Sequence, residues 1–434
     1  MLQALQTRSM GFNGRLLFIF GVPAVLVLIL EGEPLRVLCG PAYYWVAFTL
    51  WFCLGSLFSS WKGGSIAVLW DFVRTALLML FVVAGSIVTW RQCQWVIRTI
   101  ALACVLNLAS VWLLERSTAW GGRLGLEFGL VGNPNDFAGH LLLCLPCVLW
   151  VVLDSKSVIL RLAAFGVMIA GIYAVLRTAS RGAEIALAVE VLLFFFRGTA
   201  RQRFALVCLA PIAIVGLMAI LPNPVVSRLF SFTSGASEVS QEALGSSRAR
   251  SYVLRKSIEY TGRFPIFGLG AGQFAAYEGQ HNIVLGSHGY WHGAHNSFMS
   301  AAVEGGIPAG IFFLAAWVSA FRLLNSTHKQ ARKRENCKDI ELMSLCMMIA
   351  VLGFMVAIAF LNFTFMFYGP TVGGISVAIW RAAKGEFEKR SLASRPDPPG
   401  ASFSDSRRQP SAHRLKPFTP SLPFRGGNIV GGPR

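Results

Sequence analysis

The sequence predicts an all-α protein, a polytopic bundle of about 10–12 transmembrane helices with one larger extramembrane loop that contains short helices. Hydrophobic residues make up 54% of the 434 residues and charged residues only 14%, whereas soluble globular chains carry about 25% charged residues. The mean hydropathy is +0.56. The hydrophobic residues also form runs of roughly 20, which is the length that a membrane-spanning helix needs.

Hydrophobic runs close to this length lie at residues 16–31, 41–58, 66–89, 94–114, 135–153, 158–177, 182–197, 204–221, 297–321, 341–361 and 363–380. Arg8 and Arg15 precede the first run, and no cleavage site of small residues follows it. We therefore interpret this run as a retained span and not as a signal peptide.

Basic residues orient these spans. Lys and Arg gather at 197–203, at 322–338 and after Trp380, and the positive-inside rule places such segments in the cytoplasm. The long polar segment 222–296 then lies in the periplasm, as does the segment 115–134. Counting the spans backwards puts the N-terminus outside, which conflicts with the arginines near it, so the N-terminal orientation stays open.

These assignments divide the chain into four parts. N-terminal spans occupy 1–115, a central region that includes the loop 222–296 occupies 116–310, C-terminal spans occupy 311–390, and a tail occupies 391–434. The tail is basic, rich in proline and without an apolar period, so we expect it to be disordered and cytoplasmic.

The net charge of +18 does not indicate a nucleic-acid partner, because the positive residues lie in short loops and in the tail and not on the face of a soluble fold. The nine cysteines lie mostly inside hydrophobic runs, and none lies in the segment 222–296. No disulfide framework is therefore predicted, and we interpret the cysteines as small buried hydrophobic residues.

Four polar motifs fall on the predicted periplasmic side. The first is Gly-Asn-Pro-Asn-Asp at 132–136, which follows Arg123. Asn133 can cap a helix and Pro134 suits its first position, so the helix would direct free N–H groups outward, where they attract phosphate. The alternative is an ordinary capped beginning of a span.

The second motif, Thr-Ala-Ser-Arg-Gly at 178–182, also begins a span, with Ser180 as a candidate cap. Arg181 would lie at the periplasmic surface of the bilayer, against the positive-inside bias, and this favours a specific role. Alternatively, Arg181 extends along the bilayer to reach lipid headgroups.

The third motif is a basic helix within the loop. Residues 247–261 combine spaced apolar residues with Arg248, Arg250 and Arg255, which predicts a surface helix that ends before Pro265. The alternative is that these arginines only face solvent or lipid headgroups.

The fourth motif is a histidine group, His288, His292 and His295, that ends at the beginning of a span. Histidine titrates near neutral pH, so His295 could take a proton from an attacking hydroxyl. A second interpretation is a metal site with His-x3-His-x2-His ligands, which the absence of Cys and the scarcity of carboxylates in the loop disfavour. A third is a histidine with only a structural role at the helix end.

Together the four motifs resemble the O-antigen ligase and polysaccharide polymerase family of integral membrane proteins. The segments that match the family's motifs are 132–138, 180–182, Arg250 with the glycine-rich stretch 267–274, and His295-Asn296 with Glu304. The glycines of the stretch 267–274 also predict a tight turn. The resemblance covers roughly residues 120–310. Leu254 departs from it, because the family often has an aromatic residue there.

The resemblance implies a multi-pass glycosyltransferase of the bacterial inner membrane that moves a glycan from undecaprenyl pyrophosphate to an acceptor hydroxyl in the periplasm. The acceptor would be a growing polysaccharide in a polymerase or the lipid A core in an O-antigen ligase, and a flippase and a chain-length regulator are expected partners. The family works without a metal ion or another cofactor, and the chain has no Asp-x-Asp motif. No motif separates the two acceptors, although we favour polymerisation.

The resemblance also implies roles for the motif residues. Arg181 and Arg250 would clamp the pyrophosphate, because preorganised guanidinium groups can stabilise its charge without a metal. His295 would accept the proton of the acceptor hydroxyl. Weaker candidates for substrate binding are Arg123 and Arg255, with Arg248 as a substitute for Arg250. The asparagines that would cap helices and shape the site are Asn133, Asn135 and Asn296.

The alternative function is a transporter or flippase for a polysaccharide or a lipid-linked glycan, without transferase activity. Such proteins use broken helices near the membrane centre or repeated halves. The sequence shows no matching halves, and the candidate residues gather near one membrane face.

Overall fold

The computed structural model describes residues 37–114, 123–125, 133–223, 225–226, 238–284 and 292–393, together with the single positions Gly21, Pro23, Leu26 and Leu30. The chain divides into two units, residues 1–390 and 391–434, and the fold below is that of the first. The predicted span at 16–31 and the predicted disordered tail lie almost wholly outside the described residues.

Every regular element in the described part of the chain is a helix, which confirms the predicted all-α class. In chain order the helices are α3 (Pro41–Gly55), α4 (Lys62–Phe72), α5 (Leu78–Ser86), α6 (Trp90–Leu114), α7 (Pro134–Asp154), α8 (Val158–Arg177), α9 (Arg181–Arg197), α10 (Ala200–Ile220), α12 (Glu238–Arg263), α13 (Phe274–Val284), α14 (Ser297–Arg332), α15 (Lys338–Ile358) and α16 (Tyr368–Ala393). A wider, π-type turn at Val73–Leu77 joins α4 to α5.

Within the described residues, eight helical segments are long and apolar enough to cross a membrane. They are Pro41–Phe58, Lys62–Ser86, Trp90–Leu113, Pro134–Asp154, Val158–Arg177, Ala200–Ile220, Ser297–Arg332 and Lys338–Ile358. Each overlaps a span predicted from the sequence. Two further predicted spans are helical but outside this set, because α9 has only 17 residues and α16 runs on into charged sequence. The chain is a multi-pass membrane protein.

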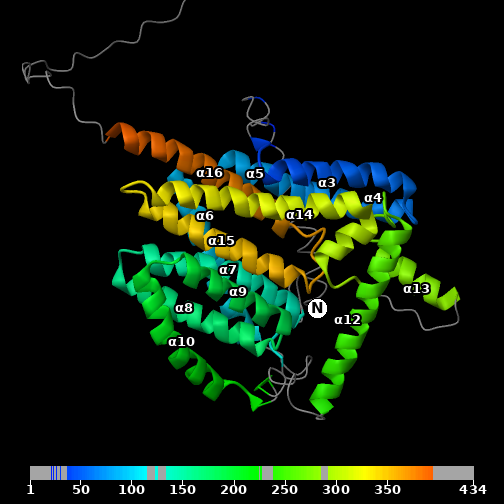
Figure 1. Ribbon diagram of the computed structural model, residues 1–434, viewed down its shortest axis with the longest axis horizontal. Helices are drawn as coiled ribbons and strands as arrows, with labels where there is room; N and C mark the ends of the chain where they lie inside the picture. The colour runs from blue at the N-terminus through cyan, green and yellow to red at the C-terminus, as the bar shows by residue number, and fades with distance from the viewer. Residues whose placement is uncertain are drawn as a thin grey trace, which may run out of the picture. The chain divides into compact units, whose positions relative to one another are not determined.

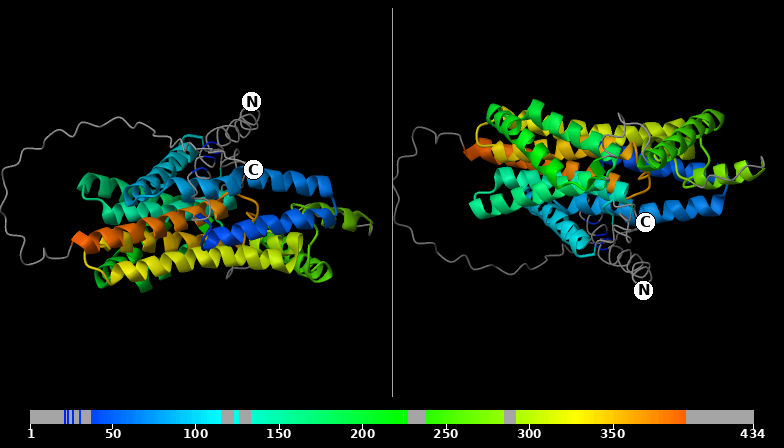
Figure 2. Two further views of the ribbon diagram at one scale, coloured as in Figure 1. Left: turned by 90° about the horizontal axis from the view of Figure 1, so that it is seen from above. Right: turned by 90° about the horizontal axis from the view of Figure 1, so that it is seen from below.

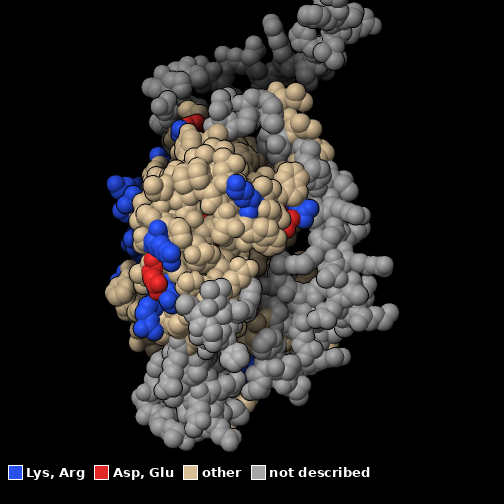
Figure 3. Space-filling view, turned by 90° about the vertical axis from the view of Figure 1, so that its right-hand side faces the viewer, with Lys and Arg blue, Asp and Glu red and all other residues tan. Residues whose placement is uncertain are grey.

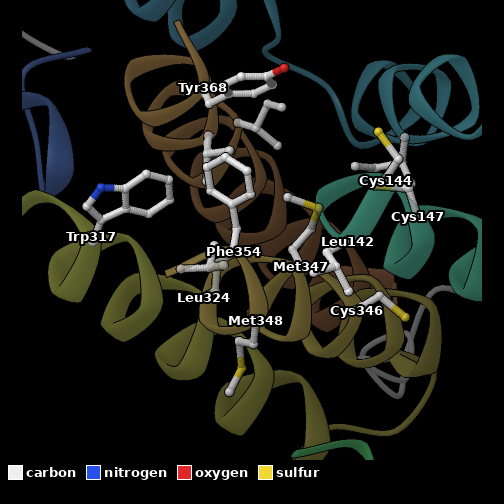
Figure 4. Packing of buried hydrophobic residues seen from close by; sticks show 14 of the residues in the cluster. Leu142, Cys144, Cys147, Trp317, Leu324, Cys346, Met347, Met348, Phe354 and Tyr368 are labelled. Atoms are coloured by element: carbon white, nitrogen blue, oxygen red, sulfur yellow. The ribbon is translucent and has the colours of Figure 1, made fainter. Parts of the chain in front are cut away.

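Helix α15 lies between two groups of helices. It packs along α14 on one side and against α7 and α9 on the other, while α3 packs on α14 (Figure 1). Figure 2 shows the bundle from two further directions. In Figure 4, Met347 of α15 lies beside Leu142 of α7, and the ring of Phe354 is 5.6 Å from that of Trp317 in α14. These contacts make α7 and α15 the most buried spans.

Helices α8 and α10 face outward. No residue of α10 is buried, and large side chains such as Ile159 in α8 and Phe204 in α10 are 82% and 72% exposed. In water such a surface would be unfavourable, whereas in a bilayer it is the surface that faces lipid.

The loop helices α12 and α13 have a small hydrophobic core, formed by Val253, Tyr260, Leu269, Phe274, Ala294 and Val303. Beside it, the buried carboxylate of Glu278 accepts hydrogen bonds from the hydroxyls of Tyr252 (2.7 Å) and Tyr260 (2.5 Å). The predicted basic helix is present but is longer than 247–261. It ends at Arg263, before Phe264-Pro265, as predicted.

Candidate active site

Helix α7 begins at the first predicted motif. Asn133 is its N-cap, and the side-chain oxygen accepts hydrogen bonds from the N–H groups of Asn135 (2.9 Å) and Asp136 (3.0 Å). The Asn133 amide nitrogen donates to the Asp136 carboxylate, and Pro134 fills the first helical position. The predicted cap is confirmed. Because the cap uses two of the free N–H groups, fewer remain to bind a phosphate.

Arg123 ties α7 to the second motif. Its guanidinium donates to the side-chain oxygen of Asn135 (2.9 Å) and to the backbone carbonyl of Thr178 (2.8 Å). The next residue, Leu124, donates from its N–H to the carbonyl of Arg177 (3.0 Å). Arg123 and Asn135, both predicted to bind substrate, thus use part of their hydrogen-bonding capacity on each other. The geometry favours a positioning role for Arg123 over direct contact with phosphate.

The corner between α8 and α9 turns through a left-handed residue. Ala179 has φ = 46°, a conformation that residues with a side chain rarely adopt. Ser180 occupies the N-cap position of α9, but its side chain makes no capping hydrogen bond, so the predicted cap is wrong. A residue outside the corner stabilises it instead: the guanidinium of Arg123 donates a hydrogen bond to the backbone carbonyl of Thr178. It places Arg181, half-buried, as the first residue of α9.

Helix α14 begins at the fourth motif, again after a left-handed residue. His295 has φ = 48°. Asn296 is the N-cap and accepts hydrogen bonds from the N–H groups of Phe298 (3.0 Å) and Met299 (3.1 Å). The predicted beginning of a helix at this point is confirmed. Backbone strain of this kind costs about 1–3 kcal/mol and clusters at functional sites, where the surrounding structure maintains it.

The segment after α15 reaches the beginning of α9. Phe360 lies against Gly182, where an added Cβ atom would be 2.7 Å from the phenyl ring. Near this contact, a recess of about 160 Å³ is lined by Asn135, Gly139, Ser180, Ala183, Ala357, Phe360 and Leu361. Ligand pockets usually measure about 300–1,000 Å³. The recess is therefore too small to hold a glycan.

The same segment is fastened to the beginning of α14. The hydroxyl of Ser297 donates to the carbonyl of Leu361 (2.9 Å) and accepts from the N–H of Phe363 (2.8 Å). The segment 360–364 thus links the beginnings of α9 and α14 at one end of the bundle.

Arg250 of α12 lies close enough to His295 to act on its protonation. Burial, first, and then the positive charges of Arg250 and His292 lower the pKa of His295 from its ordinary value. The imidazole is therefore neutral at neutral pH, and a neutral imidazole can accept a proton. The structure thus brings together two of the residues that the sequence assigned to one site.

A break in α14 holds the glycine-rich turn. At Gly306 the backbone leaves the helical conformation (φ = 77°, ψ = 176°). The carbonyls of Val303 and Glu304 accept hydrogen bonds from the N–H groups of Leu269 (3.0 Å) and Gly270 (2.8 Å), respectively. The predicted tight turn is confirmed. Two N–H groups of the turn are engaged by carbonyls of α14.

The carboxylate of Glu304 adds a second connection. Glu304 is buried and accepts hydrogen bonds from the N–H groups of Gly272 (2.9 Å) and Phe274 (3.3 Å), at the beginning of α13. A carboxylate is favourable at this end of a helix, because the free N–H groups carry partial positive charge. The turn, which follows α12, is thus bound to α14 through both backbone and side chain.

The loop between α3 and α4 supports the turn from another side, and no sequence motif indicated it. Ser60 donates from its N–H (3.0 Å) and its hydroxyl (2.9 Å) to the carbonyl of Leu269. The hydroxyl of Ser65 donates to the carbonyl of Ala271 (3.2 Å). The N-terminal spans therefore support the site through contacts across some 200 residues, which no local pattern reveals.

The remaining predicted site residues are Arg255, Arg248 and His288. Arg255 is exposed on α12, while the side chain of Arg248 and the whole of His288 lie outside the described residues. Figure 3 faces this end of the bundle and shows the Lys and Arg side chains mainly along one edge of the described surface. Where side chains are described, no group of three or more His, Cys, Asp or Glu is placed to hold a metal ion.

Comparison with known proteins adds one finding. A family model described as O-antigen ligase matches residues 163–314, from within α8 to the N-terminal half of α14. The match includes Arg181, Arg250 and His295 and implies a glycan-transferring membrane enzyme. A search among curated proteins gives no match. Residues 163–314 of this multi-pass membrane protein form a domain of the O-antigen ligase family.

Proposed function

We propose that the protein is a glycosyltransferase that moves a glycan from undecaprenyl pyrophosphate to an acceptor hydroxyl in the periplasm, without a metal ion. The observation that carries the proposal is the proximity of Arg250 to a neutral His295. Arg181 begins a helix at the same end of the bundle. A cation can stabilise the departing diphosphate, and a proton acceptor can take the proton of the attacking hydroxyl. The reaction requires both. The family match supports glycan transfer.

The arginines act on the leaving group. When the bond between the anomeric carbon and the phosphate oxygen breaks, negative charge develops on the diphosphate, which stays on the polyprenyl lipid. Arg250 and Arg181 stabilise this charge through charge-assisted hydrogen bonds. A guanidinium offers two parallel donors to phosphate oxygens, whereas a lysine offers a single point charge.

His295 acts on the acceptor. The acceptor oxygen forms a bond to the anomeric carbon on the face opposite the departing diphosphate, and its proton moves to the neutral imidazole. One bond forms at this carbon as another breaks, so its configuration inverts. The left-handed backbone of His295 and the cap at Asn296 hold the imidazole at the beginning of α14.

The distribution of basic residues supports a periplasmic site. The far ends of α9 and α14 carry the basic residues Arg197, Arg332, Lys333 and Arg334, as the positive-inside rule predicts for cytoplasmic ends. The donor would then meet the site from the outer leaflet of the bacterial inner membrane, supplied by a flippase. The acceptor would be a growing polysaccharide or the lipid A core.

A transporter function has one observation in its favour, the break in α14 at Gly306, because transporters bind ions at broken helices. In this protein the carbonyls at the break accept hydrogen bonds from Leu269 and Gly270. They are occupied by protein, so the break serves to hold the loop.

The test is transfer by the purified protein in lipid nanodiscs, with a polyprenyl-pyrophosphate glycan as donor and EDTA in the buffer. Polysaccharide and lipid A core are offered as separate acceptors. His295→Ala and Arg250→Ala should each lower the rate by roughly 10²–10⁴-fold. Arg263→Ala, at an exposed position of the same helix as Arg250, is the matched control. A strict metal requirement, or full activity in both variants, would contradict the proposal.

A further inference from the structure

Asn362 is an exposed polar residue of the segment 360–364, which links the beginnings of α9 and α14. Its neighbours Leu361, Phe363 and Thr364 are buried, and all three are hydrogen-bonded to Ser297. The backbone on both sides of Asn362 is therefore fixed, while its own side chain is open to the surface.

The amide of Asn362 lies against Gly293, two residues before His295. An added Cβ atom at Gly293 would be 2.5 Å from the amide nitrogen of Asn362, so the amide lies directly against the backbone of Gly293. The amide thus lies beside the stretch that carries the proposed base. No residue that the structure describes forms a hydrogen bond with it.

The three asparagines predicted from the sequence are already engaged with protein. Asn133 and Asn296 cap helices, and Asn135 accepts a hydrogen bond from Arg123. Asn362 differs, because its two N–H donors and its carbonyl acceptor are available to a ligand. A sugar hydroxyl both donates and accepts, so it suits an amide, whereas a phosphate only accepts and suits a guanidinium.

We infer that Asn362 binds a hydroxyl or acylamino group of a sugar next to the reacting bond and so contributes to selection of the glycan. The inference rests on the proposed function, which places a sugar beside His295. That sugar belongs either to the donor, next to its pyrophosphate, or to the acceptor. Asn362 lies outside the matched region 163–314, so this selectivity comes from the C-terminal spans and not from the matched domain.

Steady-state kinetics of Asn362→Ala test the inference, with donor and acceptor concentrations varied separately. Loss of one hydrogen bond to a bound sugar should raise one KM about tenfold. A higher KM for the donor assigns the sugar to the donor, and a higher KM for the acceptor assigns it to the acceptor. The other KM should stay within about twofold of the wild type.

Asn362→Asp tests whether the side chain at position 362 lies close enough to act on His295. Where residue 362 reaches the imidazole, a carboxylate at this position stabilises the charged form, so the pKa of His295 should rise and the acid limb of the pH–rate profile should move to higher pH. The matched control is Asn325→Asp, because Asn325 lies at the far end of the bundle and accepts a hydrogen bond from Arg197. This control should leave the profile unchanged.

The outcomes separate the two claims. If neither KM rises in Asn362→Ala and the profile does not move in Asn362→Asp, while His295→Ala is inactive, the role of Asn362 is overturned and the proposed function stands. Full activity of His295→Ala defeats the proposed function whatever the Asn362 variants do. Gel filtration of each variant checks that it is folded.

Discussion

The guanidinium of Arg123 lies 2.9 Å from the side-chain oxygen of Asn135 and donates a hydrogen bond to it. Because Arg123 also binds Thr178, this bond connects the beginnings of α7 and α9. Arg123→Ala should lower the free energy of unfolding by about 1–3 kcal/mol, since it leaves polar acceptors without a donor. Thermal unfolding in detergent measures this loss. With Asn135→Ala added, the loss should be smaller than the sum of the two single losses, and additive losses would show that the residues are not coupled.

The pH dependence of transfer should report His295. Burial and Arg250 disfavour its charged form and lower its pKa, so the neutral base persists below the ordinary value of about 6.5. Activity should therefore be constant near neutral pH and should fall only as the pH drops through this lowered pKa. The measurement is kcat/KM against pH. An acid limb at pH 7 or above would mean that another group is the base.

The break in α14 can be tested with two glycines. Gly306→Ala adds a Cβ atom 2.0 Å from the carbonyl oxygen of Ile266, at a residue with φ = 77°, and the left-handed conformation alone costs about 1–2 kcal/mol. We expect a lower unfolding temperature and loss of transfer. Gly262→Ala in α12 meets no atom within 4 Å and should be neutral or stabilising by about 0.5–1 kcal/mol. Equal behaviour of the two variants would argue against a structural need for the break.

The buried carboxylate of Glu278 should hold α12 in place. Glu278→Ala removes the acceptor of the Tyr252 and Tyr260 hydroxyls, and each lost bond should cost about 1–3 kcal/mol locally. Hydrogen exchange should then become faster in residues 238–284 and stay unchanged in α15. The control is Lys256→Ala, because the ion pair of Lys256 with Glu259 (2.8 Å) is partly exposed and contributes less than about 1 kcal/mol. Unchanged exchange in Glu278→Ala would show that the tyrosines need no carboxylate.

The sidedness of the loop can be measured by cysteine labelling in intact cells. The exposed native cysteines, Cys53 and Cys208, are first replaced by serine. Gly262→Cys in α12 should react with a membrane-impermeant maleimide, whereas Lys333→Cys at the far end of α14 should react only after lysis, because the predicted topology places these residues on opposite sides. Labelling in the reverse order would remove α12 from any periplasmic donor.

Local sequence was sufficient to predict where several helices begin or end. Asn133-Pro134 predicted the cap of α7, Asn296 the beginning of α14 and Phe264-Pro265 the end of α12, because each of these features depends on residues a few positions apart. Hydrophobic runs predicted the spans, because solubility in lipid depends mainly on composition. The roles of the predicted site residues stay predictions.

Local sequence patterns do not predict contacts between segments that are distant in the chain. Ser180 was expected to cap α9 and does not, because Arg123, 55 residues before Thr178, holds that corner. The predicted span at 297–321 is broken at Gly306, where two carbonyls pair with the glycine-rich turn. Such pairing depends on which segments the bundle brings side by side, and this information is tertiary.

The break at Gly306 divides α14 into two parts with different neighbours. The N-terminal part, Ser297–Gly305, is hydrogen-bonded to the glycine-rich turn and to the segment 360–364, while the C-terminal part packs along α15. The two parts of α14 can therefore differ in direction. The part that follows His295 takes its position from the glycine-rich turn and from the segment 360–364.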